Sequence, residues 1–305
     1  MVAFSGGSET FLATRAHRAI VWVLIPLALM LIDTAAFGAE ADPDVLRVSA
    51  IPDENPSEIL RVYMPFADYL SKELGLRVQF VPVIDYAATV EALVAKKLDL
   101  VWYGGLTSVQ AVRRTGGAAT RLVMRQEDAA FTSVFVARRD SGIKNLSDLA
   151  GKTFAFGSVS STSGHLMPRF FLLRHGIDPD RDFAKKPAFA GAHDSAALWV
   201  AAGKVDAAAL NSLVWAKLVE TKRIDVSRVA VFWTTPPYVD YAWTARTELS
   251  PALRERIVRA FLQLSYDNRE HRRLLDLHRT KGYSRARDED WRPIEDAAIA
   301  SGLLK

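Results

Sequence analysis

Gly-Ser-Val-Ser-Ser-Thr-Ser-Gly-His, at residues 157–165, joins a predicted strand to a predicted helix. The apolar run 153–156 predicts the strand, and residues 166–173 predict the helix, which His175-Gly176 ends. A hydroxyl-rich turn at a helix start is suited to an anion, because the first N–H groups lack partners and the helix dipole favours negative charge. The turn contains no Lys or Arg, so neutral donors would hold the anion. An ordinary serine cap remains the alternative.

Strand and helix patterns alternate on both sides of this turn. Asn55-Pro56 starts a helix that Gly75 ends, and Asp85 caps a second helix that runs through Val94. Such alternation predicts mostly parallel sheets flanked by helices, an α/β fold. Further strands are predicted at 45–51, 77–83, 98–103, 205–210 and 229–233, a helix at 192–202, and helical structure over the tail 251–304.

Two extended stretches, 131–138 and 238–246, flank the middle of the chain. We therefore expect a two-lobe clamshell in which two strands cross between the lobes. Lobe 1 would comprise residues 39–134 plus 241–305, and lobe 2 residues 135–240. The ligand cleft would lie at the carboxyl ends of the strands, as is usual for open α/β sheets.

The N-terminus predicts export. Arg15 and Arg18 precede the apolar run 19–32, and small residues at 35–39 allow cleavage after Gly38, so residues 1–38 are a predicted signal peptide. An uncleaved anchor is the alternative. The sequence has no cysteine, which excludes disulfides and a lipidated cysteine. The expected location is the periplasm.

Composition and motifs exclude several functions. The 305 residues carry a formal net charge of +4, but no dense basic patch with interleaved aromatics, so nucleic acid is not an expected partner. Residues 157–161 lack Ser at the centre of a nucleophile elbow, and no P-loop lysine is present. His271 and His278 lie in an arginine-rich helix, where a solvated face is favoured over a metal site. We expect neither an enzyme nor a cofactor.

From residue 46 onward the chain resembles, nearly end to end, the periplasmic substrate-binding proteins of phosphate/phosphite/phosphonate ABC importers. Residues 154–166 look like the branch labelled putative selenate-binding proteins. The resemblance implies a type II binding-protein clamshell, an ABC permease as partner and a monomer; an extracytoplasmic sensing domain for the same anions is the alternative. The segments that carry it are Ile-Pro-Asp-Glu-Asn-Pro at 51–56, Asp-Tyr-Ala-Ala at 85–88, Val-Trp-Tyr-Gly-Gly at 101–105, Ser-Ser-Thr-Ser-Gly at 160–164, Gly-Ala-His-Asp at 191–194 and Trp-Thr-Thr-Pro-Pro-Tyr at 233–238.

The resemblance also implies a set of ligand-binding residues around a tetrahedral oxyanion. Thr132 stands where phosphonate binders tend to have Tyr, and Asn211 near the place where many relatives have an acidic residue for an amine. Both differences favour a compact anion. Every residue of the predicted set could instead have a purely structural role, as a helix cap, a core side chain or a surface side chain. The predicted set is Tyr86, Thr132, Ser160, Ser161, Thr162, Ser163, His193, Asn211 and Asp240, and Tyr103 is added because it ends a predicted strand before two glycines.

Asp240 bears on the choice of anion. A buried carboxylate next to an anion is repulsive unless the ligand has a proton to share. Phosphate, phosphite and methylphosphonate keep a proton near neutral pH, whereas sulfate and selenate do not. An unpaired Asp240 therefore favours phosphorus oxyanions, and an Asp240 paired with a protonated His193 would weaken that preference.

Overall fold

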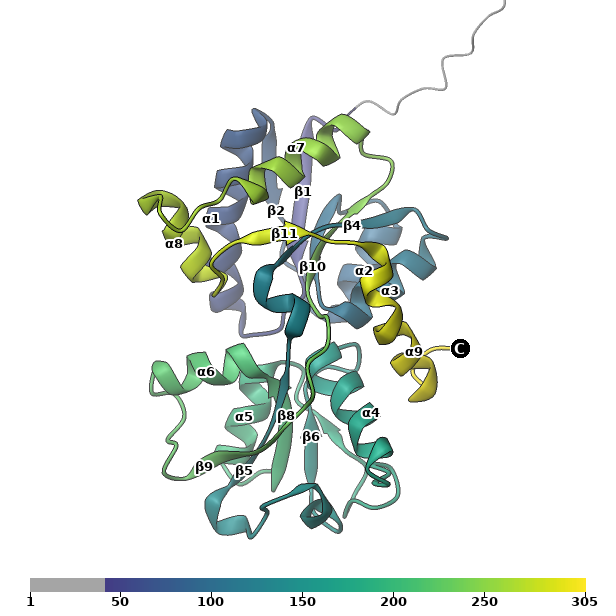
Figure 1. The fold of residues 1–305 in the computed structure, drawn as a ribbon, viewed down its shortest axis with the longest axis vertical. Helices are drawn as coiled ribbons and strands as arrows, with labels where there is room; N and C mark the ends of the chain where they lie inside the picture. Colours follow the sequence, from purple (N-terminus) through teal and green to yellow (C-terminus); the bar gives the residue numbers. More distant parts are fainter. Residues whose placement is uncertain (1–41) are drawn as a thin grey trace, which may run out of the picture. The chain divides into compact units, whose positions relative to one another are not determined.

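The structure is a computed structural model that describes residues 42–305, and it places their strands in two sheets (Figure 1). The predicted signal peptide lies outside the described residues. The first sheet has the order β11-β4-β10-β3-β1-β2 and the second β7-β6-β8-β5-β9. The first contains β1 (Val45–Ala50), β2 (Arg77–Phe80), β3 (Leu100–Tyr103), β4 (Ala119–Arg125), β10 (Ala242–Arg246) and β11 (Tyr283–Arg285); the second contains β5 (Ser133–Arg138), β6 (Phe154–Phe156), β7 (Ala188–Phe189), β8 (Ala207–Asn211) and β9 (Val229–Thr234).

Both sheets are mixed, which corrects the expectation of mostly parallel sheets. β1 pairs in parallel with β2 and β3, and β6 pairs in parallel with β7 and β8. β10 and β5, which continue from the crossing segments, run antiparallel to both of their neighbours. The tail is not wholly helical either, because β11 pairs antiparallel with β4.

Helices cover both sheets, and their ends follow the predicted caps. Asn55 accepts a hydrogen bond from the Glu58 N–H, and Gly75 ends α1 with φ +56°. Asp85 caps α2 by accepting from the Ala88 N–H. With the first sheet, as the first lobe, lie α1 (Pro56–Leu74), α2 (Tyr86–Val94), α3 (Gly105–Arg114), α7 (Pro251–Leu262), α8 (Arg269–Leu277) and α9 (Arg292–Ala300); with the second, as the second lobe, lie α4 (Met167–Arg174), α5 (His193–Ala201) and α6 (Ser212–Glu220).

The chain crosses between the lobes twice, from β4 to β5 and from β9 to β10, as the two extended stretches predicted (Figure 1). At the crossing, Phe131 and Tyr238 exchange two backbone hydrogen bonds of 2.7 and 2.9 Å. β5 begins at Ser133, slightly before the predicted start of lobe 2, and the exact lobe boundaries stay a prediction.

The hydrophobic cores show how closely the lobes approach each other. Each face of the second sheet has a core of its own. Leu166 and Met167, at the start of α4 in the second lobe, pack instead into the core of the first. Along residues 42–305 no helix combines the length and the apolar character needed to cross a bilayer. The same residues contain no cluster of His, Asp or Glu side chains suited to a metal ion.

Candidate functional site

The serine-rich turn forms a single π-helical turn, Thr162–Leu166, that leads into α4. Ser161 caps it by accepting a hydrogen bond of 2.9 Å from the Gly164 N–H. Gly164 has no room for a side chain, since a Cβ there would lie 2.8 Å from the His193 ring and 3.0 Å from the Ser161 hydroxyl oxygen. The ordinary capping role and close packing against His193 therefore occur together in this turn.

Six buried polar side chains from both lobes meet around this turn, and we call them the turn cluster. None is more than 2 % exposed. The Leu106 N–H donates to Thr162 Oγ1 at 2.9 Å, which joins α3 of the first lobe to the turn. The adjacent Gly105 N–H donates to Asp240 Oδ1 at 2.8 Å. The turn cluster consists of Tyr86 from α2, Ser161, Thr162 and Ser163 from the turn, His193 from the start of α5, and Asp240 from the second crossing segment.

Four atoms of the turn cluster are buried without a hydrogen-bond partner: Tyr86 Oη, Ser163 Oγ, His193 Nε2 and Asp240 Oδ2. Buried polar side-chain atoms usually have a partner, and leaving one unpaired costs roughly 1–3 kcal/mol. Several such atoms in one cluster, drawn from both lobes, indicate a site shaped for a polar ligand.

The ring of His193 is held as a neutral donor. Its Nδ1 accepts the Asn211 N–H at 3.2 Å, so the proton of the neutral ring must lie on Nε2. Complete burial lowers the pKa of His193 to about 4. At neutral pH the unpartnered Nε2–H is therefore a hydrogen-bond donor without charge, which disfavours the protonated His193 that would pair with Asp240.

Asp240 is the one acidic group of the turn cluster. Its backbone is fixed on both sides, because its N–H donates to the Asp128 carbonyl at 3.0 Å and its carbonyl accepts the Trp291 indole N–H at 2.8 Å. Burial raises the pKa of Asp240 to about 7, against the opposing hydrogen bond from Gly105. The carboxyl can thus hold or release a proton near neutral pH.

No lysine or arginine belongs to the turn cluster. Arg125 is buried nearby, but its guanidinium donates to both carboxylate oxygens of Asp128, at 2.8 and 2.7 Å. Its positive charge is therefore already neutralised. Tyr86, in turn, stays a neutral donor, since burial and the charge of Asp53 raise its pKa well above the ordinary value.

Four residues of the predicted set do not join the turn cluster. The hydroxyl of Tyr103 donates to the Thr89 carbonyl at 2.7 Å. Thr132 is half-buried and donates to the Ser212 hydroxyl at 3.1 Å. Ser160 is also half-buried. The Asn211 side chain caps α6, although its backbone N–H fixes His193. Binding roles for these four stay predictions without geometric support.

The sequence did not predict two contacts beside the turn cluster, one between a tyrosine and an aspartate and one between a tyrosine and a serine. The Tyr241 hydroxyl donates to Asp53 Oδ2 at 3.1 Å, and Asp53 lies in the 51–56 motif. Ser133 and Tyr238 share a hydrogen bond of 2.5 Å, and the Ser133 hydroxyl lies 2.7 Å from the Ser163 carbonyl. The sequence offered one signal for Asp53, because it is the acidic residue next to Pro52 in the 51–56 motif. Nothing in the sequence distinguishes Ser133 from other serines.

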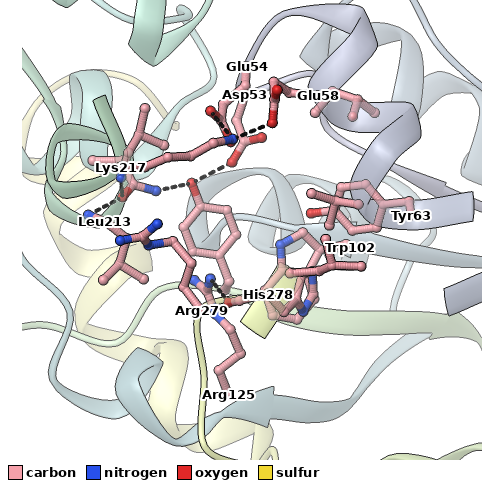
Figure 2. A pocket seen from close by; sticks show the side chains of 16 residues that line it. Asp53, Glu54, Glu58, Tyr63, Trp102, Arg125, Leu213, Lys217, His278 and Arg279 are labelled. Carbon is pink, nitrogen blue, oxygen red and sulfur yellow. Dashed lines mark hydrogen bonds and ion pairs between the residues drawn. The ribbon is translucent and has the colours of Figure 1, made fainter. Parts of the chain in front are cut away.

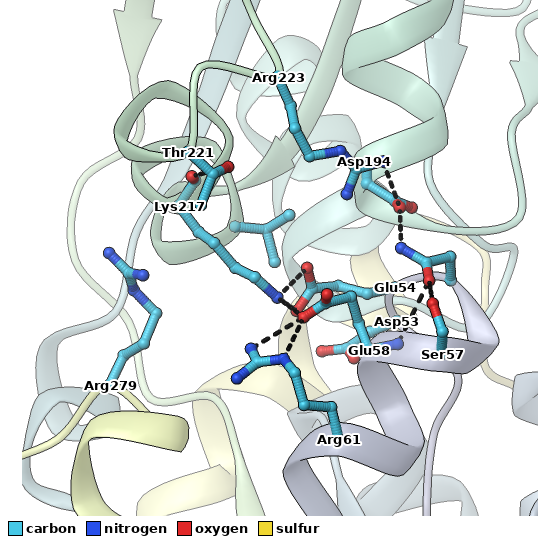
Figure 3. Close-up of polar contacts among 12 residues, drawn as sticks. Asp53, Glu54, Ser57, Glu58, Arg61, Asp194, Lys217, Thr221, Arg223 and Arg279 are labelled. Atoms are coloured by element: carbon cyan, nitrogen blue, oxygen red, sulfur yellow. Dashed lines mark hydrogen bonds and ion pairs between the residues drawn. The ribbon is translucent and has the colours of Figure 1, made fainter. Parts of the chain in front are cut away.

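A second polar group, the ion-pair cluster, joins the lobes at another place (Figures 2 and 3). It consists of Lys217 from α6 of the second lobe and Glu54 and Glu58 from the first. The Lys217 ammonium lies 2.8 Å from Glu54 Oε2 and 2.6 Å from Glu58 Oε2. The Lys217 and Glu54 side chains are only 11 % and 12 % exposed. Every charge in this cluster has its partner within the protein.

Two α/β lobes crossed twice by the chain, with a buried and partly unpartnered polar cluster between them, define a solute-binding protein of the clamshell class. A family model described as "ABC transporter, phosphonate, periplasmic substrate-binding protein" matches residues 48–291. The chain belongs to this family.

The relatives agree with that assignment. A probable ABC transporter phosphite-binding protein, PhnD1 of Prochlorococcus marinus, is 36% identical over 84% of this chain and 89% of its own length. The phosphate-import protein PhnD of Mycolicibacterium smegmatis is 32% identical over 74% of this chain and 73% of its own. A solved structure of the Prochlorococcus protein in complex with methylphosphonate has a TM-score of 0.82 at 34% identity and covers 86% of this chain and 100% of that one. The two-lobe fold expected from the sequence is thus confirmed.

Proposed function

We propose that this chain binds a small tetrahedral phosphorus oxyanion in the turn cluster and delivers it to the permease of an ABC importer. The observation that carries the proposal is the set of four buried, unpartnered atoms on Tyr86, Ser163, His193 and Asp240. Three of them can donate a hydrogen bond and the fourth is a carboxyl oxygen. A tetrahedral anion with one protonated oxygen is complementary to this combination.

Asp240 selects among oxyanions in this proposal. An ionised Asp240 can accept a hydrogen bond only from a ligand that carries a proton, and a phosphate-type group has a second pKa near 6. Phosphite, phosphate and methylphosphonate meet that condition. A fully ionised selenate or sulfate has no proton to donate and can form a hydrogen bond with Asp240 only when Asp240 itself is protonated. We therefore propose weaker binding of selenate than of the phosphorus anions.

The ligand also selects the closed arrangement of the lobes. Tyr86 comes from the first lobe and Ser163 and His193 from the second, so one bound anion contacts both. A ligand shifts a conformational equilibrium only through contacts that differ between the two states. The crossing segments at Phe131 and Tyr238 are the proposed hinge, and the closed form is the one that docks on the permease.

The names of the relatives support the same ligand class, since they refer to phosphite, phosphate and methylphosphonate. The family description names a periplasmic protein, and we propose the same location for this chain, reached through cleavage of the predicted signal peptide. We also propose that the chain acts as a monomer and has no enzymatic activity. Sequencing the N-terminus of the exported protein tests the cleavage: a start near Ala39 is expected. An intact N-terminus held in the membrane would favour the sensing alternative.

Calorimetry with phosphite, methylphosphonate, phosphate, sulfate and selenate tests the ligand. Binding of at least one phosphorus anion, more tightly than sulfate or selenate at pH 7.5, is the expected result. Selenate binding in the absence of any phosphorus binding would refute the phosphorus assignment. The double variant Ser161→Ala/Thr162→Ala should weaken binding, and an unchanged affinity would exclude the turn as the site.

A further inference from the structure

A separate small cavity of about 40 Å³ lies between the lobes (Figure 2). Its size allows a few water molecules at most. Lys217, which lines the cavity, bridges Glu54 and Glu58, as Figure 2 shows. The remaining lining combines apolar side chains with the polar groups of Arg125, His278 and Arg279. The apolar side chains include those of Ile59, Val62, Tyr63, Leu213, Val214 and Leu277.

Three further lining residues, Asp53, Asn211 and Tyr241, are also linked to the turn cluster through their backbones, and we call them the partition. The Asp53 carbonyl accepts the His193 N–H at 2.9 Å. The Asn211 N–H donates to the His193 ring, and Tyr241 directly follows Asp240 in the chain. Each member of the partition therefore lines the cavity and is attached to the turn cluster.

Hydrogen bonds make the partition continuous. Asn211 Nδ2 donates to the Tyr241 hydroxyl at 2.9 Å, and that hydroxyl donates to Asp53 Oδ2 at 3.1 Å. The three side chains come from the second lobe, the crossing segment and the first lobe, in that order. The partition is complete only while the lobes are together, because it needs all three.

Packing holds the Tyr241 ring in place. It stacks on Trp102 with centroids 5.5 Å apart and an interplanar angle of 13°, and the Arg125 guanidinium lies 5.1 Å from its centroid. The ring is 2 % exposed. A side chain fixed in this way cannot turn aside for a ligand without the loss of these contacts and of both hydrogen bonds.

We propose that the partition, with Tyr241 at its centre, sets the upper limit on ligand size, and that the cavity behind it is a latent extension of the site. This inference rests on the proposed function. With the partition closed, the turn cluster accepts an oxyanion whose substituent is a hydrogen, a hydroxyl or a methyl group. A longer alkyl chain would have to displace the phenol ring. Without the ring, the chain would enter a space lined by Ile59, Val62 and Leu213.

The test compares methylphosphonate with propylphosphonate by calorimetry in the wild type and in Tyr241→Ala. We expect the wild type to bind methylphosphonate at least 100-fold more tightly than propylphosphonate. In Tyr241→Ala the ratio should fall below 10-fold. Tyr241→Leu, which removes the phenol but keeps an apolar core residue, should lower the affinity ratio to an intermediate value. This variant replaces Tyr241→Ala in the test if the alanine variant does not fold.

Tyr63→Ala is the matched control. Tyr63 is a buried tyrosine that lines the same cavity from α1 and is outside the partition. Its removal enlarges the cavity but leaves the partition intact, so the wild-type ratio should persist. A folded Tyr241→Leu with the wild-type ratio, or a wild type that binds both phosphonates equally, would overturn the inference. A wild type that binds neither methylphosphonate nor phosphite would instead refute the proposed function itself, and the inference with it.

Discussion

The turn cluster and the ion-pair cluster both join the two lobes through polar groups, yet they are built in opposite ways. In the ion-pair cluster the ammonium of Lys217 contacts both Glu54 and Glu58. In the turn cluster four buried atoms have no partner, and no cation is present. The first is complete without a ligand, and the second is not.

The difference teaches which interactions belong to the protein and which to its ligand. A buried group without a partner costs free energy in the closed state that lacks the ligand, whereas the charges of the ion-pair cluster partner each other in the closed state with or without it. Closure should therefore be favoured modestly by the ion-pair cluster and decisively by the anion. Variants that remove single groups from either cluster can test this division.

His193→Ala should have the largest effect. The variant removes the Nε2–H donor, and a hydrogen bond to a charged group contributes roughly 1.5–3 kcal/mol, so phosphite affinity should fall about 100-fold. Calorimetry measures the change. Tyr103→Phe is the control, because the Tyr103 hydroxyl is taken by the Thr89 carbonyl, and its affinity should match the wild type. Equal losses in the two variants would contradict the assignment of the turn cluster.

Asp240→Asn should change selectivity more than affinity. An amide can donate to an anion, so selenate and sulfate should gain on phosphite by about 30-fold at pH 7.5, where the carboxylate of the wild type repels them. Competition of each anion against labelled phosphite measures the ratio. A variant that excludes selenate as strictly as the wild type would show that Asp240 does not control the choice.

The same variant should alter how stability depends on pH. Burial raises the pKa values of Asp53 and Asp240 to about 7, so between about pH 4 and pH 7 each of these two carboxyls binds more protons in the folded state than in the unfolded state. Each therefore contributes a fall in stability as pH rises, by at most about 1.4 kcal/mol per pH unit, whereas the buried His165 and His193, whose pKa values are lowered to about 4, contribute with the opposite sign. Urea unfolding should show that the stability of ligand-free Asp240→Asn, measured relative to the wild type, rises between pH 4 and pH 7, and a difference that does not change with pH would contradict the shifted pKa of Asp240.

Lys217→Met should weaken phosphite binding by about 10-fold. The substitution leaves Glu54 without its cation beside Glu58, which keeps only Arg61 at 2.8 Å, and loss of one partner of a largely buried pair is destabilising. Adding Glu54→Gln and Glu58→Gln should restore most of the affinity. Lys97→Met, at an exposed position, is the control and should bind like the wild type. Failure of the triple variant to recover would argue against a charge effect.

Arg279→Ala should have the smallest effect. The Arg279–Glu220 pair also joins the two lobes, at 2.8 Å, but its side chains are 31 % and 67 % exposed. Exposed pairs contribute about 0–1 kcal/mol, so the affinity should change less than about 3-fold. A loss as large as that of Lys217→Met would mean that burial does not distinguish the two ion pairs.

Local rules recovered much of this fold from the sequence. Asn55, Asp85 and Gly75 act within a few residues of the chain, and the structure confirms each as a helix boundary. β11 could not be predicted, because three residues become a strand only through pairing with β4. The antiparallel members of each sheet were missed for a similar reason, since strand direction depends on how distant segments meet.

The candidate site divides in the same way. The serine turn is local, and its neighbours in the turn cluster were carried over from the family resemblance. Tyr103 was included because it ends a strand before two glycines, yet the direction of its hydroxyl depends on Thr89 in another element. The partition was not foreseen, because Asp53, Asn211 and Tyr241 are far apart in the sequence and meet only when the lobes are together.

A crystal structure of the protein with phosphite tests the central claim most directly. The account predicts closed lobes and an anion whose oxygens lie within hydrogen-bonding distance of Tyr86 Oη, Ser163 Oγ, His193 Nε2 and Asp240 Oδ2. The ion-pair cluster should keep its contacts and make none with the ligand. An anion bound to Lys217 or Arg125, with those four atoms still unpartnered, would contradict the account.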